Sequence, residues 1–347
     1  MNNKGIDIEY MAKLKGKRHP LVVGIELTEQ CNLRCIHCCI RADGNRPRHQ
    51  ELTTAQWRRV LREMREAGVI YILLTGGEPL RRSDFKKVYL SAKKMNFAVT
   101  VATNGTLITK DLIELFQKYP PLMLEITSYG VNRKAYESVT RIPGSYEAFQ
   151  KAIGLLSGSG IRFAIRTMVV KKTFNEVLEN HQNIKASGIK CVFGLPLLLR
   201  RDRDKRKNDL IRGQRLGPKE IAVFMRHFSE GGSKSQKEKY SAGRRIEGCG
   251  CYSLGGTVLS DGTWTSCQHI AKSYLNLKKV SFADAWDRSS MGEMLSAKQD
   301  AACGECEHKV YCRWCPGIAY LETGNPKAKV PYLCRIMETM RKKGACQ

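Results

Sequence analysis

The chain has 347 residues, 42% hydrophobic and 27% charged, a composition typical of a globular protein of one or two domains. No apolar run approaches the length of a membrane span, and residues 1–20 are polar and basic, unlike a signal peptide. We therefore expect a cytoplasmic protein without a membrane segment. In that compartment the 14 cysteines would stay reduced and serve metal binding rather than disulfides.

The net charge of +26 favours acidic partners, with a well-solvated basic surface as the equally weighted alternative. Charge alone would also suit a nucleic acid. Aromatic residues are not interleaved with the basic ones to stack bases, so we expect a nucleic-acid partner to be unlikely.

Apolar runs alternate with amphipathic segments along the first 200 residues, which predicts an α/β fold with a parallel sheet. Expected helices begin at Thr53 and Ser83 and cover Asp111–Tyr119, Tyr146–Leu156 and Thr173–Ala186. Six such units make a partial (β/α)6 barrel or an open doubly wound sheet, with chemistry beyond the carboxyl ends of the strands. The expected strands are Leu21–Leu27, Val69–Leu74, Phe97–Thr103, Leu122–Thr127, Ile161–Val170 and Lys190–Leu195.

The pattern divides the chain into a basic extension (1–20), a barrel core (21–198), a charged linker with one helix (199–246) and a cysteine-rich α+β segment (247–347). The charged stretch from Leu199 to Pro218 is either a solvated linker or a basic loop that gathers an acidic peptide near the active rim. In the last segment, Gly256–Ser260 and Thr263–Ser266 predict a hairpin that presents Cys267.

Two motifs follow the first two expected strands. Cys31, Cys35 and Cys38 can hold three corners of a four-iron cluster and leave one iron open. Gly76-Gly77-Glu78-Pro79 combines glycines that permit close backbone approach with a carboxylate that can accept hydrogen bonds from a ligand ammonium. The alternative for the cysteines alone is a zinc knot with His37 or Cys39 as fourth ligand, which would leave the second motif unexplained.

Together these motifs resemble the radical SAM (S-adenosylmethionine) superfamily, with His37 in the place of the family's usual aromatic residue. The resemblance implies a partial barrel, a [4Fe-4S] cluster bound to SAM, and a 5′-deoxyadenosyl radical that abstracts hydrogen from the substrate. It also implies SAM contacts by Gly76, Gly77, Glu78 and Pro79, by Asn104 and Ser128, by Arg166 with Arg141 as its rival, and by Phe193 or Leu195.

The C-terminal cysteines resemble the SPASM (twitch-type) domain, which carries auxiliary [4Fe-4S] clusters in radical SAM enzymes that modify peptides and proteins. One departure is that two residues, not three, separate Cys312 from Cys315. The alternative is one or two zinc ribbons. The resemblance implies an inner cluster on Cys251, Cys267 and Cys315, with Cys249 as the candidate fourth ligand, and an outer cluster on Cys303, Cys306, Cys312 and Cys334.

These resemblances imply a maturase that forms a thioether or carbon–carbon cross-link in a ribosomal precursor peptide. Runners-up are formylglycine formation as in sulfatase maturation, peptide epimerisation and RNA modification, with a non-catalytic iron–sulfur carrier as the alternative outside enzymes. Since the cofactors supply the chemistry, we expect no acid–base pair. Expected partners are the peptide or protein substrate, a separate leader-binding protein and a flavodoxin- or ferredoxin-type reductant.

Overall fold

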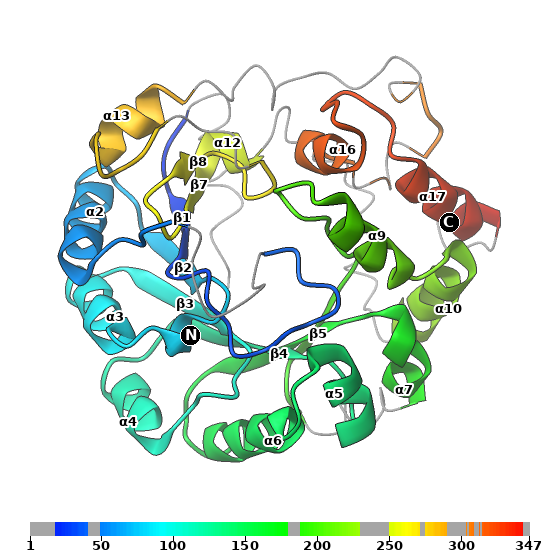
Figure 1. Ribbon diagram of the computed structural model, residues 1–347, viewed down its shortest axis with the longest axis horizontal. Coiled ribbons are helices and arrows are strands. Elements are labelled where there is room, and N and C mark those ends of the chain that lie inside the picture. Colours follow the sequence, from blue (N-terminus) through cyan, green and yellow to red (C-terminus); the bar gives the residue numbers. More distant parts are fainter. Residues whose placement is uncertain are drawn as a thin grey trace.

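The computed structural model describes residues 18–40, 49–179, 188–229, 250–270, 275–289, 303, 305–308, 312 and 314–342. One curved eight-stranded sheet forms its centre, in the order β6-β5-β4-β3-β2-β1-β7-β8 (Figure 1). Strands β1 to β6 run parallel, so the predicted α/β fold with six parallel strands is confirmed. The strands are β1 (Val22–Glu26), β2 (Tyr71–Thr75), β3 (Ala98–Thr103), β4 (Met123–Ser128), β5 (Phe163–Met168), β6 (Cys191–Gly194), β7 (Gly255–Val258) and β8 (Trp264–Thr265).

The predicted hairpin is present as β7 and β8, but it is not part of a separate sheet. Strand β7 pairs in parallel with β1 and thereby extends the barrel sheet. Gly255 makes this approach possible, because a Cβ there would lie 1.7 Å from the Val22 carbonyl oxygen. The cysteine-rich segment is thus joined to the core through its first strand.

Helices α2 to α7 cover the outer side of the curved sheet, and α13 lies beside α2 (Figure 1). Helices α9, α10, α16 and α17 lie on the side where the barrel is open, and α12 lies beside β7. Two short 3-10 turns, η1 (Pro79–Arg81) and η2 (Lys171–Thr173), accompany them. The helices are α2 (Thr54–Glu66), α3 (Phe85–Lys94), α4 (Lys110–Lys118), α5 (Arg133–Thr140), α6 (Ser145–Leu156), α7 (Phe174–Glu179), α9 (Lys205–Gly213), α10 (Pro218–Ser229), α12 (Gly250–Leu254), α13 (Phe282–Asp287), α16 (Pro316–Thr323) and α17 (Pro331–Lys342). None of the described helices is long and apolar enough to cross a lipid bilayer.

Alternating burial along the strands separates an apolar outer face from a more open inner face. In β4, Leu124 and Ile126 are fully buried in the main core, whereas Glu125 between them is half-buried. Ile126 lies close to Ala152 of α6, on either side of Gly105, which places the buried set under the helices. The inner face of the barrel is therefore the one that holds polar side chains.

Two local expectations about helices were wrong, and one helix was missed. The helix expected at Ser83 is capped at Asp84, whose carboxylate instead accepts hydrogen bonds from Arg82 and Thr54. Helix α5 was not predicted, although Asn132 caps it through a hydrogen bond from Ala135 N. The charged stretch after β6 contains two helices, α9 and α10, rather than one, because Asp204 caps α9 and Ile211 anchors it in the core.

Candidate active site

The loop after β1, residues 27–40, carries the cysteine triad and is fixed at both ends. Near its start, the Thr28 hydroxyl and the Glu29 amide both donate to one Glu51 carboxylate oxygen, each at 2.8 Å. Further on, Arg34 N donates to the Thr140 carbonyl at the end of α5 (2.9 Å). The backbone of the loop is thus held in place by the protein.

Gly76 and Gly77 allow the loop after β2 to pack against the cysteine loop. The amides of Gly77 and Glu78 form a short ladder with the cysteine loop: Gly77 N donates to Thr28 O and Glu78 N to Gln30 O, both at 2.8 Å. A Cβ at Gly76 would lie 2.5 Å from Thr28 O, and one at Gly77 would lie 2.4 Å from Gln30 O. Gly76 also has φ of 147°. The absence of a Cβ at both glycines therefore allows the loop after β2 to pack directly against the cysteine loop.

Glu78 is fully buried and joins the loops after β2 and β3. Its carboxylate accepts hydrogen bonds from Leu80 N (3.0 Å), Thr103 Oγ1 (2.6 Å) and Asn104 N (2.7 Å). Burial raises the pKa of Glu78 to about 7, and these three bonds oppose the rise. A carboxylate has about four acceptor positions, so one remains for a ligand. Its contact with SAM stays a prediction.

Asn104, also predicted at the site, connects the third loop to the cysteine loop. Its Nδ2 donates to Asn32 Oδ1 at 3.0 Å and lies 3.9 Å from Cys31 Sγ. Its Oδ1 accepts from the amide and hydroxyl of Thr106. The side chain is 5% exposed and its orientation is fixed by these bonds. The ends of β1, β2 and β3 therefore form one hydrogen-bonded unit around Cys31.

The triad thiols are strongly desolvated. Burial raises the pKa of Cys31 to about 11 and that of Cys35 to about 12, and it raises the pKa of Cys38 still more clearly. The Cys31 thiol further raises the pKa of Cys35, and the Cys39, Cys35 and Cys31 thiols further raise the pKa of Cys38, because these groups lie close together. A hydrogen bond from Tyr129 lowers the pKa of Cys35 and opposes these effects.

Such a donor set fits a metal cluster. Buried neighbouring thiols become thiolates when a metal replaces their protons. Three thiolates suit a four-iron cluster with one open iron, because cysteine sulfur is the usual ligand of such clusters. Among the described residues, no three cysteine, histidine or carboxylate side chains are already gathered tightly enough to hold a metal ion, so the fit concerns donor chemistry and loop placement.

The other predicted SAM contacts lie at different depths. Ser128 ends β4, is 8% exposed and has its hydroxyl 3.4 Å from Gly130 O. Arg166 lies on the inner face of β5 and forms two hydrogen bonds, at 2.9 and 3.0 Å, with Glu125 Oε2 on the neighbouring strand. Leu195 packs against the apolar cluster between α10 and α17. These assignments stay predictions.

A cavity of about 490 Å³ adjoins the triad and lies between the cysteine loop and α9. Cys35, Ile36 and Cys38 form part of its wall. The described residues that line it include five cationic side chains and no carboxylate. The cations are Arg34, Arg141, Lys172, Arg200 and Lys207.

Arg141, the rival of Arg166, is one of these cations. It is the C-cap of α5 in a left-handed conformation (φ 57°), which is unfavourable for a side chain with a Cβ. Residues held in such conformations tend to cluster at functional sites. Its position beside Cys35 and Cys38 was not evident from the sequence, since α5 itself was not expected.

An ion pair that we did not predict from the sequence joins the segment after β6 to the carboxyl end of β1. Arg201, which follows β6, donates to both carboxylate oxygens of Glu26 at the end of β1, each at 2.7 Å. Their side chains are 15% and 7% exposed. The pair connects the two ends of the six-stranded parallel segment. It also shows that the charged stretch after β6 is not simply a solvated linker.

The C-terminal cysteines lie only partly within the described residues. Cys249 and the side chain of Cys251 fall outside them. Burial raises the pKa of Cys312, and the thiols of Cys334, Cys306 and Cys303 raise it further, so this predicted outer set lies in one neighbourhood.

Two of the predicted inner ligands lie near the start of α16. Cys315 is the N-cap of α16, and its sulfur accepts a hydrogen bond from Ile318 N at 3.3 Å. Cys267, presented by the hairpin, is 3% exposed and faces the same turn, because a Cβ on Gly317 would lie 2.9 Å from its sulfur. The roles of all these cysteines as ligands stay predictions.

Comparison with known proteins identifies the barrel. Residues 25–172 match the Radical SAM superfamily. The chain is 25% identical to an AdoMet-dependent heme synthase of Methanosarcina barkeri, over 90% of this chain and 96% of that protein. It is 31% identical to the mycofactocin maturase MftC of Mycolicibacterium smegmatis over 46% of this chain and 40% of that protein.

Among solved structures, SuiB of Streptococcus suis bound to S-adenosylmethionine has the same fold. Its TM-score is 0.71 at 16% identity, over 96% of this chain and 84% of SuiB. The match to the Radical SAM superfamily, over residues 25–172, includes the cysteine triad and the Gly-Gly-Glu segment. A radical SAM domain implies a [4Fe-4S] cluster and SAM as cofactors. Residues 25–172 therefore form a radical SAM domain, and the chain is an enzyme that carries this domain.

Proposed function

We propose that this radical SAM enzyme modifies an acidic ribosomal precursor peptide and forms a thioether or carbon–carbon cross-link. The observation that carries the proposal is the cavity beside Cys35 and Cys38, whose charged lining is entirely cationic among the described residues. Three of these cations, Arg34, Arg141 and Lys172, are exposed, and a group of like charges favours an anionic ligand. The relationship to MftC, named as a maturase, supports a peptide substrate.

The protein's own residues would hold the cofactors as follows. Cys31, Cys35 and Cys38 ligate the cluster, which together with SAM supplies the hydrogen-abstracting radical. Arg141 pairs with the SAM carboxylate in preference to Arg166, because Glu125 already occupies the Arg166 guanidinium. The barrel and α9 enclose the site and keep out water and oxygen.

We further propose that residues 247–347 carry auxiliary [4Fe-4S] clusters on Cys249, Cys251, Cys267, Cys303, Cys306, Cys312, Cys315 and Cys334. The approach of Cys267 to the start of α16 and the common neighbourhood around Cys312 support two separate groups. Such a cluster would accept the electron that a substrate radical loses on closing a cross-link. Anaerobic reconstitution should yield about twelve irons per chain with three clusters, and about four if this segment holds zinc.

The test is turnover under reducing, oxygen-free conditions with flavodoxin as reductant. Wild-type enzyme with SAM should form 5′-deoxyadenosine, and a candidate precursor peptide encoded beside the gene should lose two hydrogens per cross-link, measured by mass spectrometry. If 5′-deoxyadenosine forms but no acidic peptide changes mass, the peptide proposal is wrong.

A second candidate substrate is an iron porphyrin with carboxylate side chains. The observation that favours it is the match to AdoMet-dependent heme synthase along nearly the whole of both chains, whereas the match to MftC covers about half of this one. The cationic cavity suits peripheral carboxylates as well as acidic peptides. Iron-coproporphyrin III added to the same turnover mixture should then give heme, seen as a new Soret absorption and product mass.

A further inference from the structure

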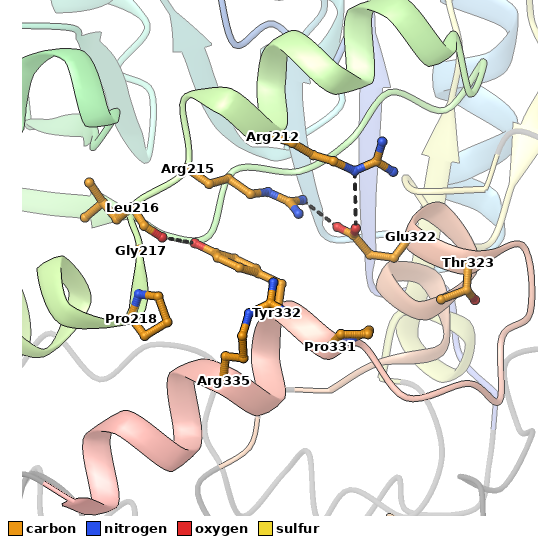
Figure 2. A pocket seen from close by; sticks show the side chains of 10 residues that line it. All are labelled: Arg212, Arg215, Leu216, Gly217, Pro218, Glu322, Thr323, Pro331, Tyr332 and Arg335. Carbon is orange, nitrogen blue, oxygen red and sulfur yellow. Dashed lines mark hydrogen bonds and ion pairs between the residues drawn. The ribbon is translucent and has the colours of Figure 1, made fainter.

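We propose that a second cavity, separated from the active-site cavity by α9, binds an acidic segment of the peptide substrate. The inference rests on the proposed peptide function and assigns a binding site remote from the cysteine triad. This cavity measures about 450 Å³ and lies between the end of α9, the start of α10, the end of α16 and the start of α17 (Figure 2). It joins the barrel to the cysteine-rich segment.

Three guanidinium groups and one carboxylate supply the charges that line this cavity: Arg212, Arg215, Arg335 and Glu322. Arg215 Nη2 donates to Glu322 Oε1 at 2.5 Å, and both side chains are at least nine-tenths buried. The Arg212 guanidinium lies 4.0 Å from the same carboxylate and 2.8 Å from the exposed Asp209. Figure 2 shows both arginines directed toward Glu322.

Arg335 supplies positive charge that none of the described residues neutralises through an ion pair. It is exposed on the first turns of α17 and forms no ion pair with any residue in the described part of the chain. With Glu322 bound to Arg215, the lining has an excess of two positive charges. Glu220, the nearest further carboxylate of α10, accepts a hydrogen bond from Gly217 N and so serves as a helix cap.

The other residues that line this cavity offer few free hydrogen-bonding groups, so the arginines are the groups expected to bind a ligand. The Tyr332 hydroxyl donates to Leu216 O at 2.9 Å, and the Arg215 guanidinium lies 4.8 Å from its ring centre. Helices α10 and α17 both begin with proline, Pro218 and Pro331, which have no amide hydrogen to offer a ligand. Guanidinium forks match carboxylates in shape and charge, so the expected ligand is a pair of Asp or Glu side chains.

Helix α9 and the residues that follow it lie between the second cavity and the active-site cavity. Ile211 and Gln214 line the active-site cavity, while Arg212 and Arg215 line the second one. A helix with its side chains is about 10–12 Å across. Since an extended peptide advances about 3.3–3.6 Å per residue, roughly three or four residues would connect the two cavities. We therefore expect the acidic anchor of the substrate to lie about that far from the modified residue.

The test uses the full-length, cluster-loaded protein and a fluorescein-labelled hexaglutamate peptide, followed by fluorescence anisotropy at two salt concentrations. Arg335→Ala and Arg212→Ala should each weaken binding about fivefold, the value for losing one partly exposed ion pair. Arg62→Ala is the matched control, because it removes the same charge from the exposed face of α2. Hexaglutamine should not bind.

Loss of affinity in both cavity variants but not in Arg62→Ala, with unchanged circular dichroism, supports the site. Equal loss in all three variants would mean that only net charge matters and would overturn it, as would unchanged binding in Arg335→Ala and Arg212→Ala. Formation of 5′-deoxyadenosine and peptide modification are measured separately in wild-type protein. Their failure refutes the proposed function, whereas the anisotropy result concerns the cavity alone.

Discussion

Replacing Arg201 by methionine should destabilise the protein by about 3 kcal/mol, because it leaves Glu26 buried without its partner. Two charge-assisted hydrogen bonds of 2.7 Å are lost, and the Glu26 side chain is only 7% exposed. Breaking a buried pair by removing one member costs roughly 3–5 kcal/mol, and the partial exposure of Arg201 places the value near the lower end. Guanidinium-induced unfolding of anaerobically purified protein, followed by fluorescence, measures this loss.

The double variant Glu26→Leu/Arg201→Met removes both charges and should recover most of the loss, to within about 1 kcal/mol of wild type. Arg62→Met, on the exposed face of α2, should change the free energy of unfolding by less than about 0.5 kcal/mol. A cost below about 1 kcal/mol for Arg201→Met, or a double variant no more stable than the single one, would refute the claim that this pair holds the barrel closed.

Three further outcomes follow from the site. Cys35→Ala should abolish 5′-deoxyadenosine formation while Cys39→Ala retains it, as measured by liquid chromatography; equal activity in both would contradict the triad. Gly76→Ala should cost about 1–3 kcal/mol in urea unfolding, since its Cβ would meet Thr28 O at 2.5 Å. In contrast, Gly154→Ala, inside α6 with open space, should stabilise by about 0.5–1 kcal/mol. The pKa of Glu78 is raised to about 7 from 4.5, so between these pH values the folded state binds a proton that the unfolded state has lost. The free energy of unfolding should therefore fall as pH rises through that window, by at most about 1.4 kcal/mol per pH unit. This pH dependence should disappear in Glu78→Gln.

The parallel sheet was predictable because its strands read as nearly continuous apolar runs, although only alternate side chains are fully buried. Leu124 and Ile126, for example, lie in such a run and enter the core as expected. Helix α2 was equally clear, since Thr53 and Gln56 form a complete capping box before an amphipathic stripe. Helix α5 escaped prediction because it is only eight residues long.

The site was predictable where chemistry depends on local spacing and not where it depends on pairing across the fold. The triad and the Gly-Gly-Glu segment are readable because each lies in one short stretch. The partner of Arg166 is a residue 41 positions away, and the partner of Arg201 lies 175 positions away. No local pattern distinguishes a paired arginine from one that is open to a ligand.

That distinction changes the meaning of the net charge of +26. In the stretch after β6, Arg200 and Arg215 are buried and bound to Asp202 and Glu322, so they stabilise the closure of the barrel, although each also lines a cavity. The sequence alternatives, a solvated linker or a basic loop, both treated these charges as equivalent. The paired arginines hold α9 in place and so position the neighbouring cations on both of its sides. Replacing Asp202, the partner of Arg200, should therefore weaken acidic-ligand binding even though Asp202 lines neither cavity.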